Sequence, residues 1–490
     1  MKPNHLPTVA LLACLAGGCA NLPSVGPDYH APETKMPEHW SEPLAGGETN
    51  AAAATAARWN NFHDAELDSL ITRAVRSNLD LRIAQARVSE ARAQYRIASA
   101  DFWPTLDASG SFARQRESKN QPLVGPGDHL PAGIPSENSF YQSGFDASWE
   151  VDVFGGARRA TEAARAHVAA TQFGEHEVLV TLLGEVARNY VEARGYQRRL
   201  EIARDNIRAQ EQSLAIVQNR FTNGLTSDLD VQQASTVLAT TRAVVPALET
   251  ALAASIHRLG VLLGQTPESL ETELATVGPI PAAPPVVPVG LPSDLLLRRP
   301  DVALAERQLA AATANIGVAK SDLFPKFYLT GAAGFEGASA DDWFTSGSKF
   351  WSFGPSVQWR IFDAGRIRAN VKVQNARQEQ ALASYENTAL SAFEDVENAL
   401  TAYAKEQIRR QQLDAAVKSS KESLRLANQL YANGLSNFIN VLDAERSLYQ
   451  AQDAQVQSDK TVTTDVIALY KSLGGGWASI EHPAALALKQ

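Results

Sequence analysis

Cysteine is almost absent from the sequence, with two residues in a chain of 490. Cys14 lies inside the apolar run Val9–Ala16, which is typical of an export signal and would be removed with it. The mature chain then keeps Cys19 alone, and a single thiol forms neither an intrachain disulfide nor a thiolate metal site. The sequence therefore excludes a fold that depends on disulfides or on a cysteine-bound metal.

The sequence also lacks an excess of positive charge and the motifs of common enzymes. Its formal net charge is −9, and phosphate binding needs a basic face, so nucleic acid is not expected as a partner. The nine histidines show no metal-ligand spacing, no glycine-rich phosphate loop precedes a helix, and no nucleophile elbow is present. We expect neither an enzyme nor a bound cofactor, apart from a covalent lipid.

The lipid is expected from the N-terminus. Lys2 is followed by Val9–Ala16 and two glycines before Cys19, a pattern too short to span a bilayer as a retained helix. The segment LAGGC resembles a bacterial lipoprotein signal. This resemblance implies that residues 1–18 are cleaved, that Cys19 carries palmitate and further lipid, and that Ala20, which is not Asp, directs the protein to the outer membrane. A plain secretory signal is the alternative.

Proline is missing from the whole stretch between Gly156 and Asn223. At ~1.5 Å per residue, one continuous helix here reaches about 100 Å, more than a single globular domain needs. Apolar residues recur at alternating spacings of three and four, which is typical of coiled coils. They include Leu179, Leu182, Val186, Ala193, Tyr196, Leu200, Ala203, Ile207, Leu214, Val217 and Phe221. Such a helix buries its apolar stripe only against other long helices.

The sequence contains two copies of one unit. Asn78–Gly110 aligns with Arg299–Gly331, 221 positions further on, and Phe221–Ala234 aligns with Tyr431–Ala444, 210 positions further on. The change of offset falls in the Gly- and Pro-rich segment 117–137, as expected for a loop that differs in length between copies. Each copy is therefore predicted to contain a helix, two strands, a very long helix, a turn and a long helix.

These patterns predict a mainly α fold with a small membrane β-barrel and a defined domain layout. We expect a lipidated N-terminal segment at 19–63, a first repeat at 64–266, a Pro-rich connector at 267–291, a second repeat at 292–476 and a tail at 477–490. Strands are expected at 104–115, 143–154, 325–335 and 350–362, with long helices at 156–223, 227–263, 365–433 and 437–473. Shorter helices at 64–100 and 292–322 precede the strands. Pro246 is expected to interrupt the first returning helix.

Apolar and polar residues alternate along the predicted strands. The second strand alternates Phe145 and Trp149 with Asp146, which fits a transmembrane barrel but also a water-soluble sandwich. The charged polar face favours a wet lumen, and four strands cannot close a barrel in lipid, where open edges are not tolerated. A dimer gives eight strands, too narrow for a channel, whereas a trimer gives twelve. In each copy the very long helix forms one rod, and the returning helix stacked end to end with the shorter helix before the strands forms a second. Four rods per protomer then give a trimer of twelve rods around a passage.

Three segments carry a family resemblance. RRPDVALAERQLAAATANIGVAKSDLFPKFYLTG, YANGLSNFINVLDAERSLYQAQ and VGPDYHAPE closely resemble the outer-membrane efflux channels, in the lipoprotein branch that works with resistance-nodulation-division pumps. The resemblance spans Val25 to about Gly476. It implies a homotrimer with a 12-stranded β-barrel in outer-membrane lipid, continued by a 12-helix α-barrel across the periplasm. Joined to a periplasmic adaptor and an inner-membrane pump, it would export drugs or other small toxic compounds.

The turns Asn223-Gly224 and Asn433-Gly434 are expected at the free ends of the rods. Asn and Gly are helix-stop residues, which is sufficient to explain them. The resemblance adds a contact with the adaptor at these tips.

The same resemblance places a gate just beyond the second turn. Asp443 matches a ring of acidic side chains that narrows the periplasmic entrance, Ile439 could add an apolar ring, and Asn440 stands where some relatives carry a second acid. Asp228 and Asp230 lie near this level in the first copy. All three acids could instead be solvated helix-start residues favoured by the helix dipole. We expect the tips to widen when a partner docks.

Two further classes of protein remain as alternatives. The channel of a protein-secretion system would have the same tunnel, and a periplasmic coiled-coil scaffold shares the long hairpins. Four amphipathic strands and the lipid signal argue against the scaffold, and the lipid signal favours the efflux channel over the secretion channel.

Overall fold

The computed structural model describes residues 24–32, 37, 39–42, 48–49, 61–116, 137–284, 287–290, 292 and 298–475. Cys19, the signal at 1–18 and the tail at 477–490 lie outside this part of the chain. The structure divides into two compact units. We call them the sheet unit (Met1–Pro32, Ser89–Ala169 and Glu306–Ala383) and the helical unit (Glu33–Val88, Ala170–Ala305 and Ser384–Gln490).

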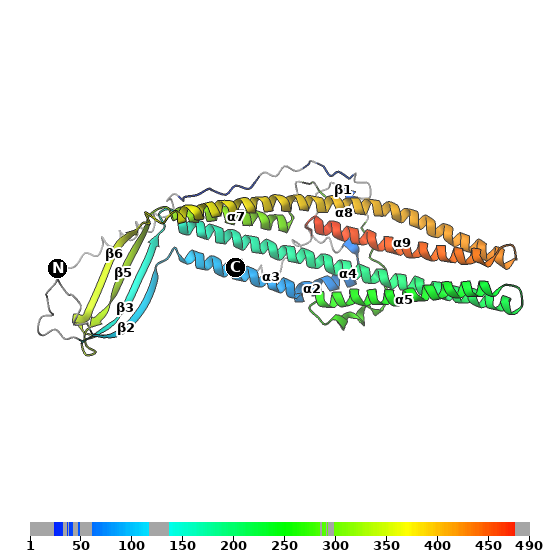
Figure 1. Cartoon of the computed structure of the whole chain (residues 1–490), viewed down its shortest axis with the longest axis horizontal. Coiled ribbons are helices and arrows are strands. Elements are labelled where there is room, and N and C mark those ends of the chain that lie inside the picture. The colour runs from blue at the N-terminus through cyan, green and yellow to red at the C-terminus, as the bar shows by residue number, and fades with distance from the viewer. Residues whose placement is uncertain are drawn as a thin grey trace. The chain divides into compact units, whose positions relative to one another are not determined.

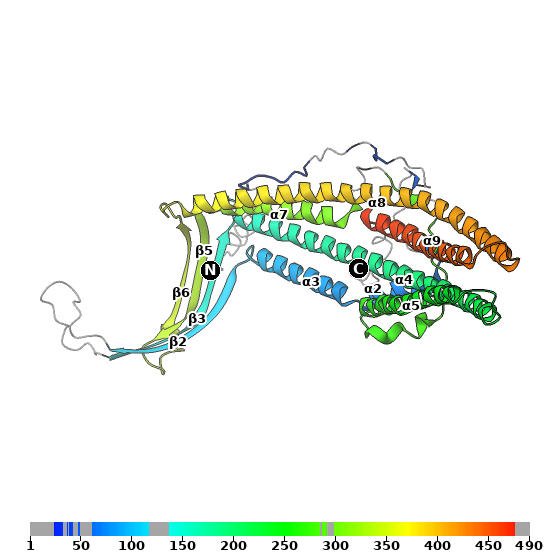
Figure 2. The same ribbon diagram turned by 45° about the vertical axis from the view of Figure 1, so that its right-hand side comes forward.

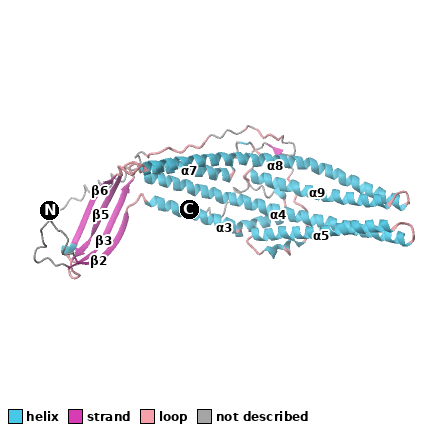
Figure 3. Ribbon diagram, viewed as in Figure 1, coloured by secondary structure: helices cyan, strands magenta, loops and turns pink. Residues whose placement is uncertain are grey.

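The described residues form two similar series of elements (Figures 1 and 3). The first is α2 (Ala65–Ser77), α3 (Leu79–Ala100), β2 (Thr105–Arg116), β3 (Glu137–Val151), α4 (Gly156–Thr222) and α5 (Asp228–Leu262). The second is α7 (Pro300–Ser321), β5 (Lys326–Gly337), β6 (Lys349–Gln358), α8 (Arg366–Ala432) and α9 (Phe438–Ser472). Between them lie η3 (Pro267–Leu270) and η4 (Glu273–Ala275). Strand β1 (Glu48–Thr49) pairs with β4 (Val287–Pro288), and η6 (Ser346–Ser348) precedes β6.

The duplication is visible in the backbone. Helices α4 and α8 both have 67 residues, and α5 and α9 both have 35. The glycines after the long helices, Gly224 and Gly434, have positive φ angles of 70° and 71°. Gly264 and Gly474, just beyond the returning helices, have φ angles of 66° and 64°. The two copies therefore end their long and returning helices by the same means.

The sheet unit contains a four-stranded antiparallel sheet in the order β2-β3-β5-β6, which Figure 2 shows from a second side. Residues that pair across neighbouring strands share a face, and the register therefore separates two faces. The apolar face carries Leu106, Phe112, Tyr141, Phe145, Trp149, Leu329, Phe335, Trp351, Phe353 and Val357. The polar face carries Asp107, Ser109, Gln142, Asp146, Glu150, Lys326, Thr330, Ser352, Ser356 and Gln358.

The apolar face is exposed. Trp351 is 81% exposed, Phe353 70% and Leu106 69%, although such side chains are normally buried. The only other sheet among the described residues is the two-residue pair β1–β4, in the other unit. The sandwich alternative is therefore not supported.

Three of the expected strand ends are wrong. Strand β3 starts at Glu137 instead of 143, because its first residues continue the pairing with β2 as far as Glu137 opposite Arg116. It ends at Val151 instead of 154, because the Asp152 carboxylate accepts hydrogen bonds from the backbone N–H groups of Ala157 (3.2 Å) and Arg158 (2.9 Å) at the start of α4. Strand β6 ends at Gln358 instead of 362, since the Trp359 indole turns to donate to the Leu323 carbonyl (3.1 Å). The other strands and long helices differ from expectation by one or two residues.

The shorter helices also differ from expectation. Instead of one helix at 64–100 there are two, because Asn78 is extended (φ −64°, ψ 132°) and its side-chain oxygen accepts from Leu81 N–H. In the second copy the helix starts at Pro300 rather than at residue 292. Pro246 lies within the continuous helix α5 and does not end it, so the expected interruption there is wrong.

Candidate functional site: the helix tips

Each long helix ends in the same turn. Gly224 N–H donates to Phe221 O and Leu225 N–H to Arg220 O, both at 2.9 Å, and Gly434 and Leu435 repeat the pattern in the second copy. This pair of bonds is the Schellman motif, which needs a positive φ at its glycine. Asn223 and Asn433 add side-chain bonds to the carbonyls four residues earlier. The four turn residues predicted from the sequence thus form two closed helix ends.

The two tip hairpins pack on each other through a small apolar cluster. Its buried members are Val217 from α4, Ala234 from α5, and Phe438, Val441 and Leu442 from α9, with partly buried residues of α8 against them. The helix α9 therefore contributes most of the tip core, and a change in its position must disturb packing with both neighbours.

A polar contact also joins the hairpins. Arg220 on α4 donates from Nη1 to the backbone carbonyl of Tyr431 on α8 (3.3 Å), and its guanidinium carbon lies 4.5 Å from the centroid of the Tyr431 ring. No motif in the sequence marks Arg220 as a contact residue. The contact holds the end of α4 against the end of α8.

The predicted gate residues of the second copy lie on the first two turns of α9. Asp443 is exposed and its Oδ1 lies 3.6 Å from Nη1 of Arg446, one turn further on. Ile439 is 39% exposed, and the Asn440 amide donates to the Ser436 hydroxyl (2.8 Å). The side chains of Asp443 and Ile439 therefore both reach the surface of α9.

The acids of the first copy have local roles. Asp228 accepts a hydrogen bond from the Gln232 amide at 3.3 Å, and Asp230 accepts one from the Thr226 hydroxyl just before the helix. Both stand in the first turn of α5, where a negative charge is favoured by the helix dipole. These contacts match the helix-start interpretation.

One charged residue near the tip was missed by the sequence analysis. Glu445 on α9 is 5% exposed, and its Oε1 accepts a hydrogen bond from the Ser213 hydroxyl on α4 (2.6 Å). Burial raises the pKa of Glu445, and the Ser213 bond opposes that shift only in part. No motif marks the residue, and only its place in the apolar spacing of α9 could have signalled it.

The motif Arg299-Pro300-Asp301 has a structural role within the helical unit. The Arg299 guanidinium pairs with Asp301 (2.7 Å) and Asp395 (3.0 Å) and donates to the Ser472 carbonyl at the end of α9 (3.0 Å). At the aligned position of the first copy, the Asn78 amide donates to the Leu262 carbonyl at the end of α5 (2.9 Å). In both copies the residue at this aligned position thus donates to a carbonyl at the end of the returning helix, but the side chain that does so is an arginine in one copy and an asparagine in the other.

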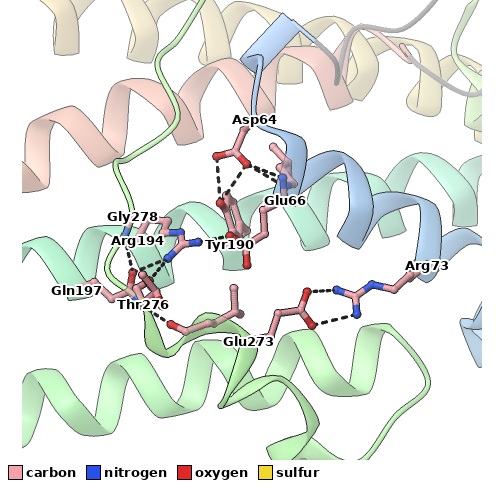
Figure 4. Close-up of polar contacts among 11 residues, drawn as sticks. Asp64, Glu66, Arg73, Tyr190, Arg194, Gln197, Glu273, Thr276 and Gly278 are labelled. Atoms are coloured by element: carbon pink, nitrogen blue, oxygen red, sulfur yellow. Dashed lines mark hydrogen bonds and ion pairs between the residues drawn. The ribbon is translucent and has the colours of Figure 1, made fainter.

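A second polar cluster ties the connector to α4 (Figure 4). Arg194 is buried and binds the Glu66 carboxylate (2.5 Å) and the Thr276 carbonyl (2.7 Å). The Tyr190 hydroxyl lies 3.0 Å from the carboxylate of Asp64, which caps α2. Burial raises the pKa of the Tyr190 phenol. The start of α2, the middle of α4 and the segment after η4 are therefore held together.

The N-terminal segment is fixed to the sheet unit. Val25 N–H donates to Phe154 O (3.0 Å) just after β3, and the buried Arg159 pairs with Asp28 (2.6 Å). Gly26 has a φ of 103°, and a Cβ there would lie 2.5 Å from the Cα of Gly317. Only glycine fits this close approach.

Comparison with known proteins agrees with this architecture. The family described as Outer membrane efflux protein matches residues 70–265 and 291–475. The solvent efflux pump outer membrane protein SrpC of Pseudomonas putida is 35% identical over 486 residues, covering 98% of this chain and 99% of SrpC. The probable outer membrane lipoprotein SilC of Salmonella typhimurium is 33% identical, covering 97% of this chain and 99% of SilC.

A solved structure gives the same result. The outer-membrane channel OprN superposes with a TM-score of 0.86 at 35% identity, covering 92% of this chain and 99% of OprN. The duplicated helices, the sheet with one exposed apolar face and these likenesses define an outer-membrane transport channel. The chain belongs to the Outer membrane efflux protein family, and it is an efflux protein of the outer membrane.

Proposed function

We propose that three copies of this chain form a continuous duct through the outer membrane and the periplasm. The four-stranded sheet supports this proposal most strongly. Its apolar face is exposed, and its outer strands β2 and β6 each pair with one neighbouring strand among the described residues. Open strand edges are not tolerated in lipid. Pairing β6 of one copy with β2 of the next closes a twelve-stranded barrel that is wide enough for a channel.

The long helices supply the rest of the duct. At ~1.5 Å per residue, α4 and α8 each extend about 100 Å, and α5 and α9 return beside them. We propose that they form a twelve-helix tunnel, and that the two repeats and the connector have the extents predicted above. The duct is passive and carries out no chemistry, so that selection of the compound belongs to the pump.

A lipid on Cys19 would hold each copy at the membrane. Cys19 lies six positions before Val25, which is fixed beside the end of β3 at Phe154. An extended chain of that length reaches about 20 Å at most, so an anchor at Cys19 stays close to the sheet. The name of SilC as a probable outer membrane lipoprotein supports this assignment.

We propose that the tips form the entrance and its gate. Three copies of Asp443 and Ile439 would line the opening, with Asn440 beside them and Asp228 and Asp230 near the same level at the start of α5. Three carboxylates near one axis concentrate negative potential and repel one another. The apolar tip cluster and the contact of Arg220 with Tyr431 oppose that repulsion and keep the opening narrow.

The partners we propose are a periplasmic adaptor and a resistance-nodulation-division pump, with the adaptor bound at Asn223, Gly224, Asn433 and Gly434. The exported compounds are small and toxic, by analogy with the solvent efflux pump that includes SrpC.

An accumulation assay tests this proposal. A strain without this chain should retain more of a fluorescent efflux substrate and become more sensitive to toxic compounds, and both effects should be reversed by the intact gene. Unchanged sensitivity together with a loss of exported protein would instead identify a protein-secretion channel.

A further inference from the structure

Glu445 is a buried acid that none of the roles above uses. It lies on α9, two residues after Asp443, and 5% of its surface is exposed. One carboxyl oxygen accepts the Ser213 hydrogen bond, whereas Oε2 is buried and has no hydrogen-bond partner among the described residues. A buried oxygen without a partner is costly, and the more so when it carries charge.

The facing side of α4 offers an acceptor of its own. Gln210 lies one turn before Ser213 and therefore on the same face of α4. Its side chain is 3% exposed, and its Oε1 is also buried without a hydrogen-bond partner. A protonated Glu445 would gain an O–H donor. The unpaired Gln210 oxygen is an acceptor on the same face of α4 as Ser213, to which Glu445 is already bonded. With the Gln210 amide oriented as it is in the structure, an ionised Glu445 leaves its own Oε2 and the Gln210 Oε1 without a hydrogen-bond partner among the described residues.

Among the residues that the structure describes, no charged group contributes to the pKa shift of Glu445. Burial is the main cause of its raised pKa and the Ser213 bond is the one opposing cause. The charged side chains of the surrounding helices pair among themselves: Arg208 with Asp205 on α4, Arg242 of α5 with Glu211, Glu422 with Arg425 on α8, and Arg446 with Asp443 on α9. Lys418 and Lys421 on α8 are exposed.

We propose that Glu445 is a proton-operated latch between α9 and α4 that holds the entrance closed when the carboxyl is protonated. When the proton leaves, the carboxylate is stable only in water, and α9 must move away from α4 to expose it. Because α9 carries Asp443 and Ile439, that movement widens the entrance. The latch rests on the proposed gate and adds to it a control by periplasmic pH.

The direction of the effect follows from linkage. The closed tip binds the proton more tightly than an open tip, in which the carboxyl is hydrated and titrates near the ordinary glutamate value of about 4.3. The closed state is therefore favoured at low pH and loses this advantage as the pH rises through the raised pKa of Glu445. Between the two pKa values, the ratio of open to closed tips rises up to about tenfold per pH unit for each proton released.

Single-channel recording of the full-length protein in planar bilayers tests the latch. The pH on the side of the tips is varied from about 4.5 to 8, a range that begins near the ordinary glutamate value. The wild type should open more often as the pH rises. Glu445→Gln, which stays neutral and keeps the shape of the acid, should remain mostly closed at every pH.

Two further variants keep the test sharp. Ser213→Ala removes a hydrogen bond to Glu445 that the closed tip makes and the open tip lacks, so the channel should open more often at every pH and its transition should shift to lower pH without being abolished. Glu422→Gln, on an exposed glutamate of α8, should keep the wild-type profile. If Glu445→Gln does not assemble, the direction in which Ser213→Ala shifts the pH of the opening transition tests the latch. A wild type that conducts with no pH dependence, or variants that titrate as the wild type does, would overturn the latch alone, whereas a wild type that forms no channel would overturn the proposed function with it.

Discussion

The guanidinium of Arg220 lies 4.5 Å from the ring centroid of Tyr431 and also donates to its carbonyl oxygen at 3.3 Å. One arginine thus joins the end of α4 to the end of α8, and with them the two tip hairpins. The contact is local, but it involves both helices that would have to separate for the entrance to widen.

Arg220→Gln should make the tips open more readily. A cation–π contact at a partly exposed site contributes about 0.5–1 kcal/mol, so the open probability of each tip should rise about two- to fivefold. Single-channel recording at fixed pH measures this. The control is Arg204→Gln, which removes an arginine of α4 that pairs with Glu249, and equal opening in both variants would show that Arg220 has no special role.

Asp443→Asn should reduce the preference of the channel for cations. Three exposed carboxylates would be removed from the entrance, and the potential that attracts cations falls with them. Reversal potentials in a salt gradient measure the change. Glu422→Gln is the matched control, because Glu422 is an exposed acid of α8 that pairs with Arg425 and has no proposed role in the gate. If both variants shift the reversal potential equally, Asp443 is a solvated helix-start acid.

Arg299→Ala should destabilise the helical unit without changing the gate. The substitution leaves Asp301 and Asp395 without their common partner and frees the Ser472 carbonyl. Removing one member of a largely buried ion pair costs about 3 kcal/mol. Thermal unfolding in detergent should show a clearly lower midpoint, whereas Arg82→Ala, at an exposed position of α3, should leave it unchanged.

Asp465 should make stability depend on pH. Burial, together with the nearby Glu406 carboxylate, raises the pKa of Asp465 to about 6. The folded protein favours the neutral form of Asp465. Its contribution to the free energy of unfolding is therefore complete below the ordinary aspartate pKa of about 4 and is lost as the pH rises through 6. At pH 8, Asp465→Asn should therefore have a higher melting temperature than the wild type, since its free energy of unfolding is larger by about 1 kcal/mol at most after solvent screening. At pH 4.5 the two proteins should melt at the same temperature. Equal melting at both pH values would contradict the assignment.

The sequence predicted the long helices well because their signal is repeated many times. Apolar spacing over Gly156–Asn223, the absence of proline and the Asn-Gly turns all agree, and the long helices ended within a residue of expectation. The strand ends were less predictable, because they depend on contacts that alternation does not encode. Asp152 leaves the strand to cap α4, and Trp359 turns to a carbonyl outside the sheet.

The site was predictable only in part. The turns and the exposed Asp443 could be read from short motifs, whereas Arg220 and Glu445 acquire their roles from the helix that packs opposite them. A glutamate within an apolar stripe looks like a defect in the pattern until Ser213 and Gln210 are seen on the facing helix. The Arg-Arg-Pro-Asp motif was recognised, but its role in joining α7, α8 and α9 needed the structure.

Three copies of the chain should close one barrel through β6 of one copy and β2 of the next. The mature chain would keep only the lipid-bearing Cys19, so introduced cysteines have no competing thiol. Ser352→Cys on the polar face of β6 can be combined in turn with Asp107→Cys, Ser109→Cys and Ser111→Cys on β2. These three positions of β2 follow one another at a spacing of two and therefore share its polar face. Oxidation in the outer membrane should give a covalent trimer for one of these pairs and little product for its neighbours. Monomers throughout, or a series that stops at dimers, would mean that the sheets of three copies do not close one barrel.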